Sequence, residues 1–221
     1  MTIICHSRQL VFVRPICHAT TSIEKYYEQI FKKGSIRAKV WTHGSRNHLP
    51  YEEILSRYPR CRDYDFITVV RNPWDYLVSC WYSFKRQETI KDWSDEDITA
   101  HFNKWIRTSY KWTKAGLPQY YPLNAGIEKF LYIIRYEHLE KDIEELNKIL
   151  EFEDVVQEHG ITLPHMRSNR QYRKSFEFYY DSDTVEIVRE KYSKVIDHFG
   201  YEIKLPEELN ARSGLDEQLE P

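Results

Sequence analysis

Short apolar runs alternate with segments of helical periodicity along most of the chain. The runs that predict buried strands are Leu10 to Val13, Arg37 to Trp41, Phe66 to Val70 and Phe130 to Arg135. Between and after them, apolar residues recur three or four positions apart, as on one face of a helix. The segments with this spacing are Ile23 to Phe31, Pro73 to Phe84, Ile98 to Ile106, Leu139 to Ile149 and Val185 to Phe199. The alternation predicts an α/β fold of three layers, with a mostly parallel central sheet flanked by helices.

The turn after the first strand is polar and rich in hydroxyl groups. Thr21 and Glu24 have the spacing of a capping box, in which the two side chains satisfy N–H groups at the start of a helix. Alternatively, the backbone N–H groups and hydroxyls of Ala19, Thr20, Thr21 and Ser22 cradle a phosphate or sulfate group. No Gly-Lys-Ser/Thr sequence occurs here, so this turn is not a Walker loop.

The strand predicted over Phe66 to Val70 leads directly into the helix predicted to begin at Pro73. Proline is favoured as the first residue of a helix, and the N-terminus of a helix attracts anions. Arg71 lies at the end of the strand and Ser79 about two helical turns further on, so the pair is expected to grip a phosphate. In the other interpretation, Arg71 pairs with Asp75 and Ser79 faces the core.

Two histidines follow the strand that ends at Trp41. His43 and His48 lie in a loop that leads into a short helix, at the carboxyl end of a predicted strand. Open α/β sheets bind their ligands at such ends, and one of the two imidazoles is a candidate general base.

Basic and aromatic residues are concentrated between Leu163 and Tyr180. Arg167, Arg170 and Arg173 fall within this segment. A solvated basic loop is one interpretation. The other is a binding surface for a polyanionic cofactor, because the protein as a whole is slightly acidic.

Length, charge and cysteine content narrow the class of protein. The 221 residues predict one domain over residues 1–204, followed by a mobile tail over residues 205–221. A net charge of -2 gives no global field for nucleic acid. We expect no membrane span and a cytoplasmic location. The cysteines are scattered, which argues against disulfides and a zinc site; they are Cys5, Cys17, Cys61 and Cys80.

Several of these segments together resemble the sulfotransferases that use 3′-phosphoadenosine 5′-phosphosulfate (PAPS), especially the carbohydrate branch. The most specific match is Val70-Arg71-Asn72-Pro73-Trp74-Asp75 with Leu77-Val78-Ser79, which is similar to the 3′-phosphate signature of that family. The segments that resemble later family landmarks are His48 to Ile54, Ile134 to Leu139, Leu163 to His165 and Tyr192 to Tyr201.

The resemblance implies a sulfotransferase fold of the P-loop NTPase-like kind and a role for each matching residue. Arg71 and Ser79 bind the 3′-phosphate, and the loop from Cys17 and His18 to Ser22 binds the 5′-phosphosulfate. His48, rather than His43, is the base. The product is 3′-phosphoadenosine 5′-phosphate (PAP), the acceptor is a glycan or another hydroxylated molecule, and no metal is expected.

One position departs from the family pattern. The family carries a lysine in the 5′-phosphosulfate loop, and the matching residue of this chain is Cys17. Arg14, Lys25 or a protonated His18 could supply the missing positive charge. The alternative is a module that binds PAPS or PAP without catalysing transfer. A phosphotransferase is a weaker alternative, because it would need the Gly-Lys-Ser/Thr loop.

Overall fold

The computed structural model describes residues 2–15, 19–34, 36, 39–41, 49–84, 90, 92–108, 126–164 and 174–205. The chain divides into two compact units, each made of two segments. The first unit comprises Met1–Arg71 and Leu117–Ser168, and the second comprises Asn72–Gly116 and Asn169–Pro221. Whether residues 1–204 act as one domain stays a prediction.

A five-stranded sheet in the order β3-β1-β2-β4-β5 forms the centre of the first unit. Strands β2, β4 and β5 are parallel neighbours, and β1 runs antiparallel to both β2 and β3. Because β3 is antiparallel to β1, it has the same direction as β2, β4 and β5. Four of the five strands therefore point the same way, which confirms the prediction of a mostly parallel sheet. The strands are β1 (Thr2–Cys5), β2 (Leu10–Phe12), β3 (Lys39–Trp41), β4 (Asp65–Val70) and β5 (Tyr132–Arg135).

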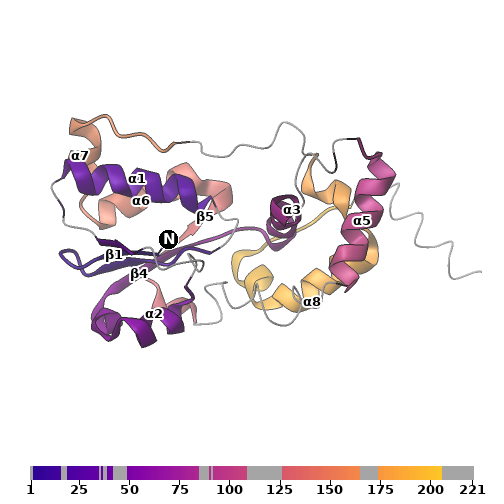
Figure 1. Ribbon diagram of the computed structural model, residues 1–221, viewed down its shortest axis with the longest axis horizontal. Helices are drawn as coiled ribbons and strands as arrows, with labels where there is room; N and C mark the ends of the chain where they lie inside the picture. The colour runs from indigo at the N-terminus through magenta and orange to yellow at the C-terminus, as the bar shows by residue number, and fades with distance from the viewer. Residues whose placement is uncertain are drawn as a thin grey trace, which may run out of the picture. The chain divides into compact units, whose positions relative to one another are not determined.

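Helices cover both faces of this sheet, so the predicted three-layer α/β architecture is confirmed (Figure 1). Successive side chains along a strand point to opposite faces of the sheet, so they pack in different cores. Ile3 and Cys5 of β1 pack in a core with α1 and α6, whereas Ile4 packs in a second core with α2. The helical elements of this unit are α1 (Thr20–Lys33), α2 (Tyr51–Arg57), η1 (Pro59–Asp63), η5 (Ile127–Lys129), η6 (Tyr136–His138), α6 (Leu139–Ile149) and α7 (Glu153–Glu158).

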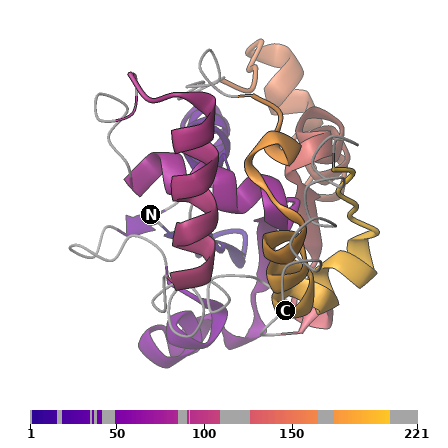
Figure 2. The same cartoon turned by 90° about the vertical axis from the view of Figure 1, so that its right-hand side faces the viewer.

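The described part of the second unit is helical and has an aromatic core. Its elements are α3 (Pro73–Phe84), α5 (Asp95–Thr108), η8 (Phe176–Tyr179) and α8 (Ser182–Phe199). Helices α5 and α8 are in contact and lie next to each other in both views (Figures 1 and 2). Asn103 of α5 joins the elements, since its amide donates to the Tyr179 carbonyl and its side-chain oxygen accepts from Thr184 of α8. The buried aromatic side chains of its described part are Trp74, Tyr76, Trp81, Phe102, Tyr179, Tyr180 and Tyr192.

The helix boundaries agree closely with the sequence pattern. Helix α3 begins at Pro73 as expected, and the Trp74 backbone N–H donates to the Asn72 side chain. Helix α8 ends before Gly200, whose φ of 65° lies in the left-handed region that glycine adopts without strain. Among the described residues, no helix is both long and apolar enough to cross a membrane.

Candidate functional site

Two of the predicted site residues, Arg14 and Arg71, lie where parallel strands of the first unit end. Strands β2 and β4 are paired in parallel, with Phe12 opposite Ile67, and the pairing continues beyond β2 through a bond from the Val13 N–H to the Ile67 carbonyl. Arg14 follows β2 and Arg71 follows β4. Both arginines are therefore carried to the carboxyl edge of the sheet, the edge at which open α/β sheets bind ligands.

Arg14 is buried beneath the first turn of α1. Its Nη1 lies 2.8 Å from Oε2 of Glu24, and both side chains are nearly inaccessible, with 6% and 5% exposed. Its Nη2 donates to the Thr20 hydroxyl over 3.4 Å. The guanidinium thus ties the end of β2 to the start of α1, and its charge is largely balanced by the carboxylate.

The capping box predicted for Thr21 and Glu24 is wrong. Helix α1 begins at Thr20, its N-cap residue is Ala19, and the described residues provide no side-chain cap at this helix start. Glu24 instead turns toward Arg14, because a buried guanidinium is a stronger partner than a backbone N–H. Ala19 has φ 53° and ψ 15°, a left-handed conformation that costs an alanine about 1 kcal/mol.

Lys25 makes its contact on the outer surface of α1. Its Nζ lies 2.6 Å from Oε2 of Glu28, and the lysine side chain is 49% exposed. The hydrogen bond with Glu28 raises the pKa of the lysine ammonium. Arg14, Lys25 and His18 were the residues expected to replace the positive charge of the lysine that the resemblance implies. Of the two that the structure describes, Arg14 contacts the predicted phosphosulfate loop, through the Thr20 hydroxyl.

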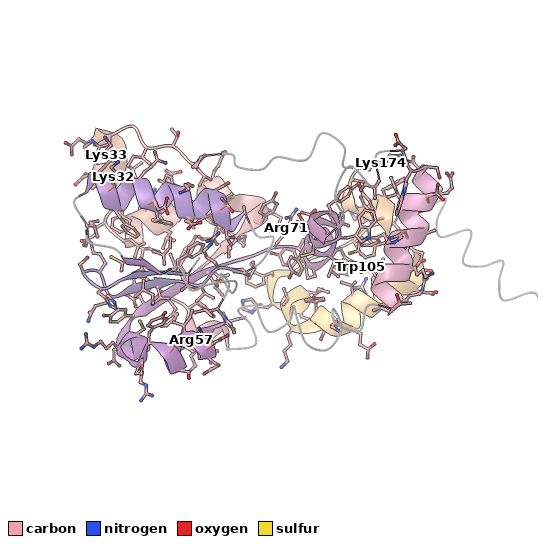
Figure 3. All side chains as sticks on the ribbon, in the orientation of Figure 1. Lys32, Lys33, Arg57, Arg71, Trp105 and Lys174 are labelled. Atoms are coloured by element: carbon pink, nitrogen blue, oxygen red, sulfur yellow. The ribbon has the colours of Figure 1, made fainter. Side chains whose placement is uncertain are left out.

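Arg71 packs against an aromatic ring from the next strand. Its guanidinium carbon lies 4.0 Å from the centroid of the Tyr136 ring, and only 3% of the residue is exposed. Tyr136 begins the turn that follows β5. Figure 3 labels Arg71 at the end of the sheet. The geometry is that of a cation–π contact.

A buried carboxylate fixes the backbone just before Tyr136. Asp142 of α6 is fully buried and accepts three bonds from Arg135, from its backbone N–H at 2.7 Å, its Nε at 2.9 Å and its Nη2 at 2.7 Å. The side-chain hydrogen bonds raise the pKa of the Arg135 guanidinium. This clamp attaches the end of β5 to α6.

Several residues predicted for the site lie outside the described residues, or in the second unit. Ser79 is half-buried on α3 in the second unit, so its pairing with Arg71 stays a prediction. Ser22 is buried in the first turn of α1 beside the half-buried Thr21. The predicted residues that lie outside the described part are Cys17, His18, His43, His48, Arg167, Arg170 and Arg173. Among the described residues, no group of histidine, cysteine and acidic side chains is arranged to hold a metal ion.

Sequence reasoning did not assign a site role to Glu24, Tyr136 or Asp142. Glu24 was assigned to a cap because its spacing fits one. Tyr136 was noted only as part of the run from Ile134 to Leu139, although an aromatic residue directly after a predicted parallel strand is a usable signal. The sequence around Asp142 gives no indication of its role, because its partner Arg135 is brought to it by the packing of α6 on β5.

Comparison with known proteins leaves the family open. No protein-family model matches the sequence, and neither does any curated protein. Among solved structures, the chain is similar to a crystal structure of the mouse sulfotransferase SULT7A1 complexed with PAP. The two share 15% identity over 85% of this chain and 86% of that chain, with a TM-score of 0.43. Similarity at this level does not establish membership of a family.

Replacing Arg14 should destabilise the protein more than removing both charges of the buried pair. Arg14→Met leaves the Glu24 carboxylate buried without its cation, so the free energy of unfolding should fall by about 3 kcal/mol. The double variant Arg14→Met with Glu24→Leu should recover part of this loss. Urea denaturation measures both values.

The matched control is Arg57→Met, which breaks an exposed ion pair with Glu53 on α2. This change should alter the free energy of unfolding by less than about 1 kcal/mol. Equal effects of Arg14→Met and Arg57→Met would contradict a buried, energetically coupled pair.

Proposed function

We propose that this chain is a sulfotransferase that moves a sulfuryl group from PAPS to an acceptor hydroxyl, with a carbohydrate as the acceptor. The observation that carries the proposal is the pair of buried arginines, Arg14 and Arg71, at the carboxyl edge of two neighbouring parallel strands. Buried guanidiniums at such an edge suit a ligand with several anionic groups. The sequence resemblance assigns those groups to the two ends of PAPS.

The proposed binding residues divide between the two ends of the nucleotide. Arg71 and Ser79 hold the 3′-phosphate, with charge-assisted hydrogen bonds from the guanidinium. The first turn of α1 and the loop before it hold the 5′-phosphosulfate, because the positive end of the helix dipole attracts an anion. The basic segment that contains Arg167, Arg170 and Arg173 adds further positive charge.

His48 is the proposed general base. The acceptor oxygen attacks the sulfur atom in line with the bridging oxygen, a new S–O bond forms, and the S–O bond to PAP breaks. His48 takes the proton of the acceptor hydroxyl, which requires a neutral imidazole within hydrogen-bond reach of that oxygen. Positive charge close to the bridging oxygen would stabilise its developing negative charge, and Arg14 is the proposed source of that charge.

A module that binds PAP or PAPS without transferring sulfate is the second candidate function. The residue that favours it is Cys17, which stands where the family carries a lysine. The ion pair with Glu24 supports it as well, because the carboxylate offsets much of the charge that Arg14 could offer to a leaving group. The two candidate functions use the same binding site, and they differ in whether the sulfuryl group is transferred to an acceptor.

PAP should stabilise the protein against heat, and Arg71→Ala should remove most of that effect. A ligand that binds only the folded state at about 100 times its Kd adds about 2.7 kcal/mol of stability. Loss of the Arg71 contacts should weaken PAP binding about a hundredfold. The measurements are thermal denaturation with PAP, compared with ATP and magnesium, and titration calorimetry.

The matched control for this binding test is Arg57→Ala, which also removes one arginine but from the surface of α2 (Figure 3). It should leave the affinity for PAP unchanged. Equal stabilisation by PAP and by ATP with magnesium would count against the site, and so would an unchanged affinity in Arg71→Ala.

Transfer of radiolabelled sulfate from PAPS to a panel of glycans should occur with the wild-type protein and be lost in His48→Ala. PAP affinity should stay the same in that variant, because the base contacts the acceptor rather than the nucleotide. The comparison variant is His43→Ala, which should retain transfer.

Normal transfer by His48→Ala would remove His48 from the role of base. Loss of transfer in His43→Ala alone would assign that role to His43. Tight binding of PAP by the wild-type protein without transfer to any glycan would favour the binding module.

A further inference from the structure

We propose that Glu24 is a specificity-determining residue, which makes the 5′ end of the nucleotide site disfavour a terminal phosphate relative to a terminal sulfate. The inference rests on the proposed function, because it takes the first turn of α1 as the place where the 5′-phosphosulfate binds. Glu24 is not assigned a contact with the nucleotide. Its negative charge acts on the start of the helix through Arg14.

Arg14 connects the Glu24 carboxylate to the first turn of α1. Its Nη1 lies 2.8 Å from Oε2 of Glu24, and its Nη2 donates to the Thr20 hydroxyl over 3.4 Å. Thr20 is the first residue of the helix, and all three residues are buried. A negative charge is therefore held inside the protein next to the helix start at which the anion is proposed to bind.

The Glu24 carboxylate is bonded at one of its two oxygens. Within the described part of the chain, its Oε1 is buried and has no hydrogen-bond partner, whereas Oε2 is paired with Arg14. By comparison, the buried carboxylate of Asp142 accepts three hydrogen bonds from Arg135. A carboxylate that only tied two elements together would be expected to resemble Asp142, because a buried oxygen without a donor is destabilising. The half-bonded carboxylate of Glu24 instead indicates a role for its negative charge.

Glu24 is the acidic residue of α1 that lies nearest to the helix start. The first turn of the helix carries no acidic residue, so the positive end of its dipole attracts an anion. Glu28, one turn further along, pairs with Lys25 on the surface, where water and salt screen its charge. The charge of the buried Glu24 is screened less, and it opposes the attraction of Arg14 and the helix start for an anion.

A 5′-phosphosulfate and a 5′-diphosphate have the same tetrahedral end group and differ in its charge. The sulfate carries one negative charge, whereas a terminal phosphate gains a second one above about pH 6. Shape does not distinguish the two groups, but a fixed negative charge repels the phosphate more strongly than the sulfate. Glu24 therefore makes charge the basis on which a sulfate donor is chosen over a diphosphate.

The test compares adenosine 5′-phosphosulfate with ADP, two nucleotides that differ in the sulfate and the terminal phosphate. Titration calorimetry at about pH 8 without magnesium gives both affinities, since the terminal phosphate of ADP has then lost its last proton. Glu24→Gln removes the charge and keeps an oxygen that can accept from Arg14. The ratio of the affinity for adenosine 5′-phosphosulfate to that for ADP should fall about tenfold, as expected for one unit of repulsion over about 10 Å at an effective dielectric constant of about 20.

The matched control is Glu28→Gln, which neutralises the other glutamate of α1 and breaks the exposed pair with Lys25. It should leave the ratio unchanged. Thermal denaturation without ligand checks that each variant is folded. The double variant Arg14→Gln with Glu24→Gln holds no buried charge at this position, so it provides the same test if Glu24→Gln alone does not fold, and its ratio should also fall.

A ratio that stays within about twofold of the wild-type value in the folded Glu24 variants would overturn the inference, and so would an equal fall in Glu28→Gln. Failure of the proposed function gives a different result. If adenosine 5′-phosphosulfate binds the wild-type protein and Glu24→Gln leaves the ratio unchanged, the role of Glu24 is wrong and the site stands. If neither adenosine 5′-phosphosulfate nor PAP binds the wild-type protein, the proposed site fails, and the role of Glu24 fails with it.

Discussion

The parallel pairing of β2, β4 and β5 is the constraint on which the site depends. Parallel strands end at one edge of a sheet, so the residues that follow them are brought together although they are far apart in sequence. Arg14, Arg71 and Tyr136 all reach this edge in that way. Apolar cores on both faces hold the strands in register, because a shift by one residue would exchange the side chains of the two cores.

Carboxylates and an aromatic ring hold the guanidiniums at this edge in place. Arg14 and Arg135 are paired with the buried carboxylates of Glu24 and Asp142, and such pairs give a fixed geometry at a small net gain in stability. Arg71 packs against the ring of Tyr136, with its guanidinium carbon 4.0 Å from the ring centroid. The Glu24 carboxylate reduces the positive charge that Arg14 could offer to a ligand.

Much of the fold could be predicted from the sequence because its signals are local. The apolar runs at Leu10 and Phe66 and the proline at the start of α3 identified their elements correctly. Strand β1 was not predicted, since Thr2–Cys5 is a short run whose partners β2 and β3 are antiparallel to it. The capping role predicted for Glu24 was wrong, because its partner is Arg14. The position of Arg14 depends on how the chain continues after β2. The contact between Arg71 and Tyr136 depends on strand order, which no local pattern encodes.

We propose that the carboxyl edge of the parallel strands binds a nucleotide with anionic groups at both ends. Amide hydrogen exchange with and without PAP tests it most directly, because a bound anion protects the N–H groups that it contacts. We expect slower exchange at Thr20 and Thr21 in the first turn of α1, with little change in α2. Unchanged exchange at Thr20 and Thr21 in the presence of saturating PAP would contradict the proposed site.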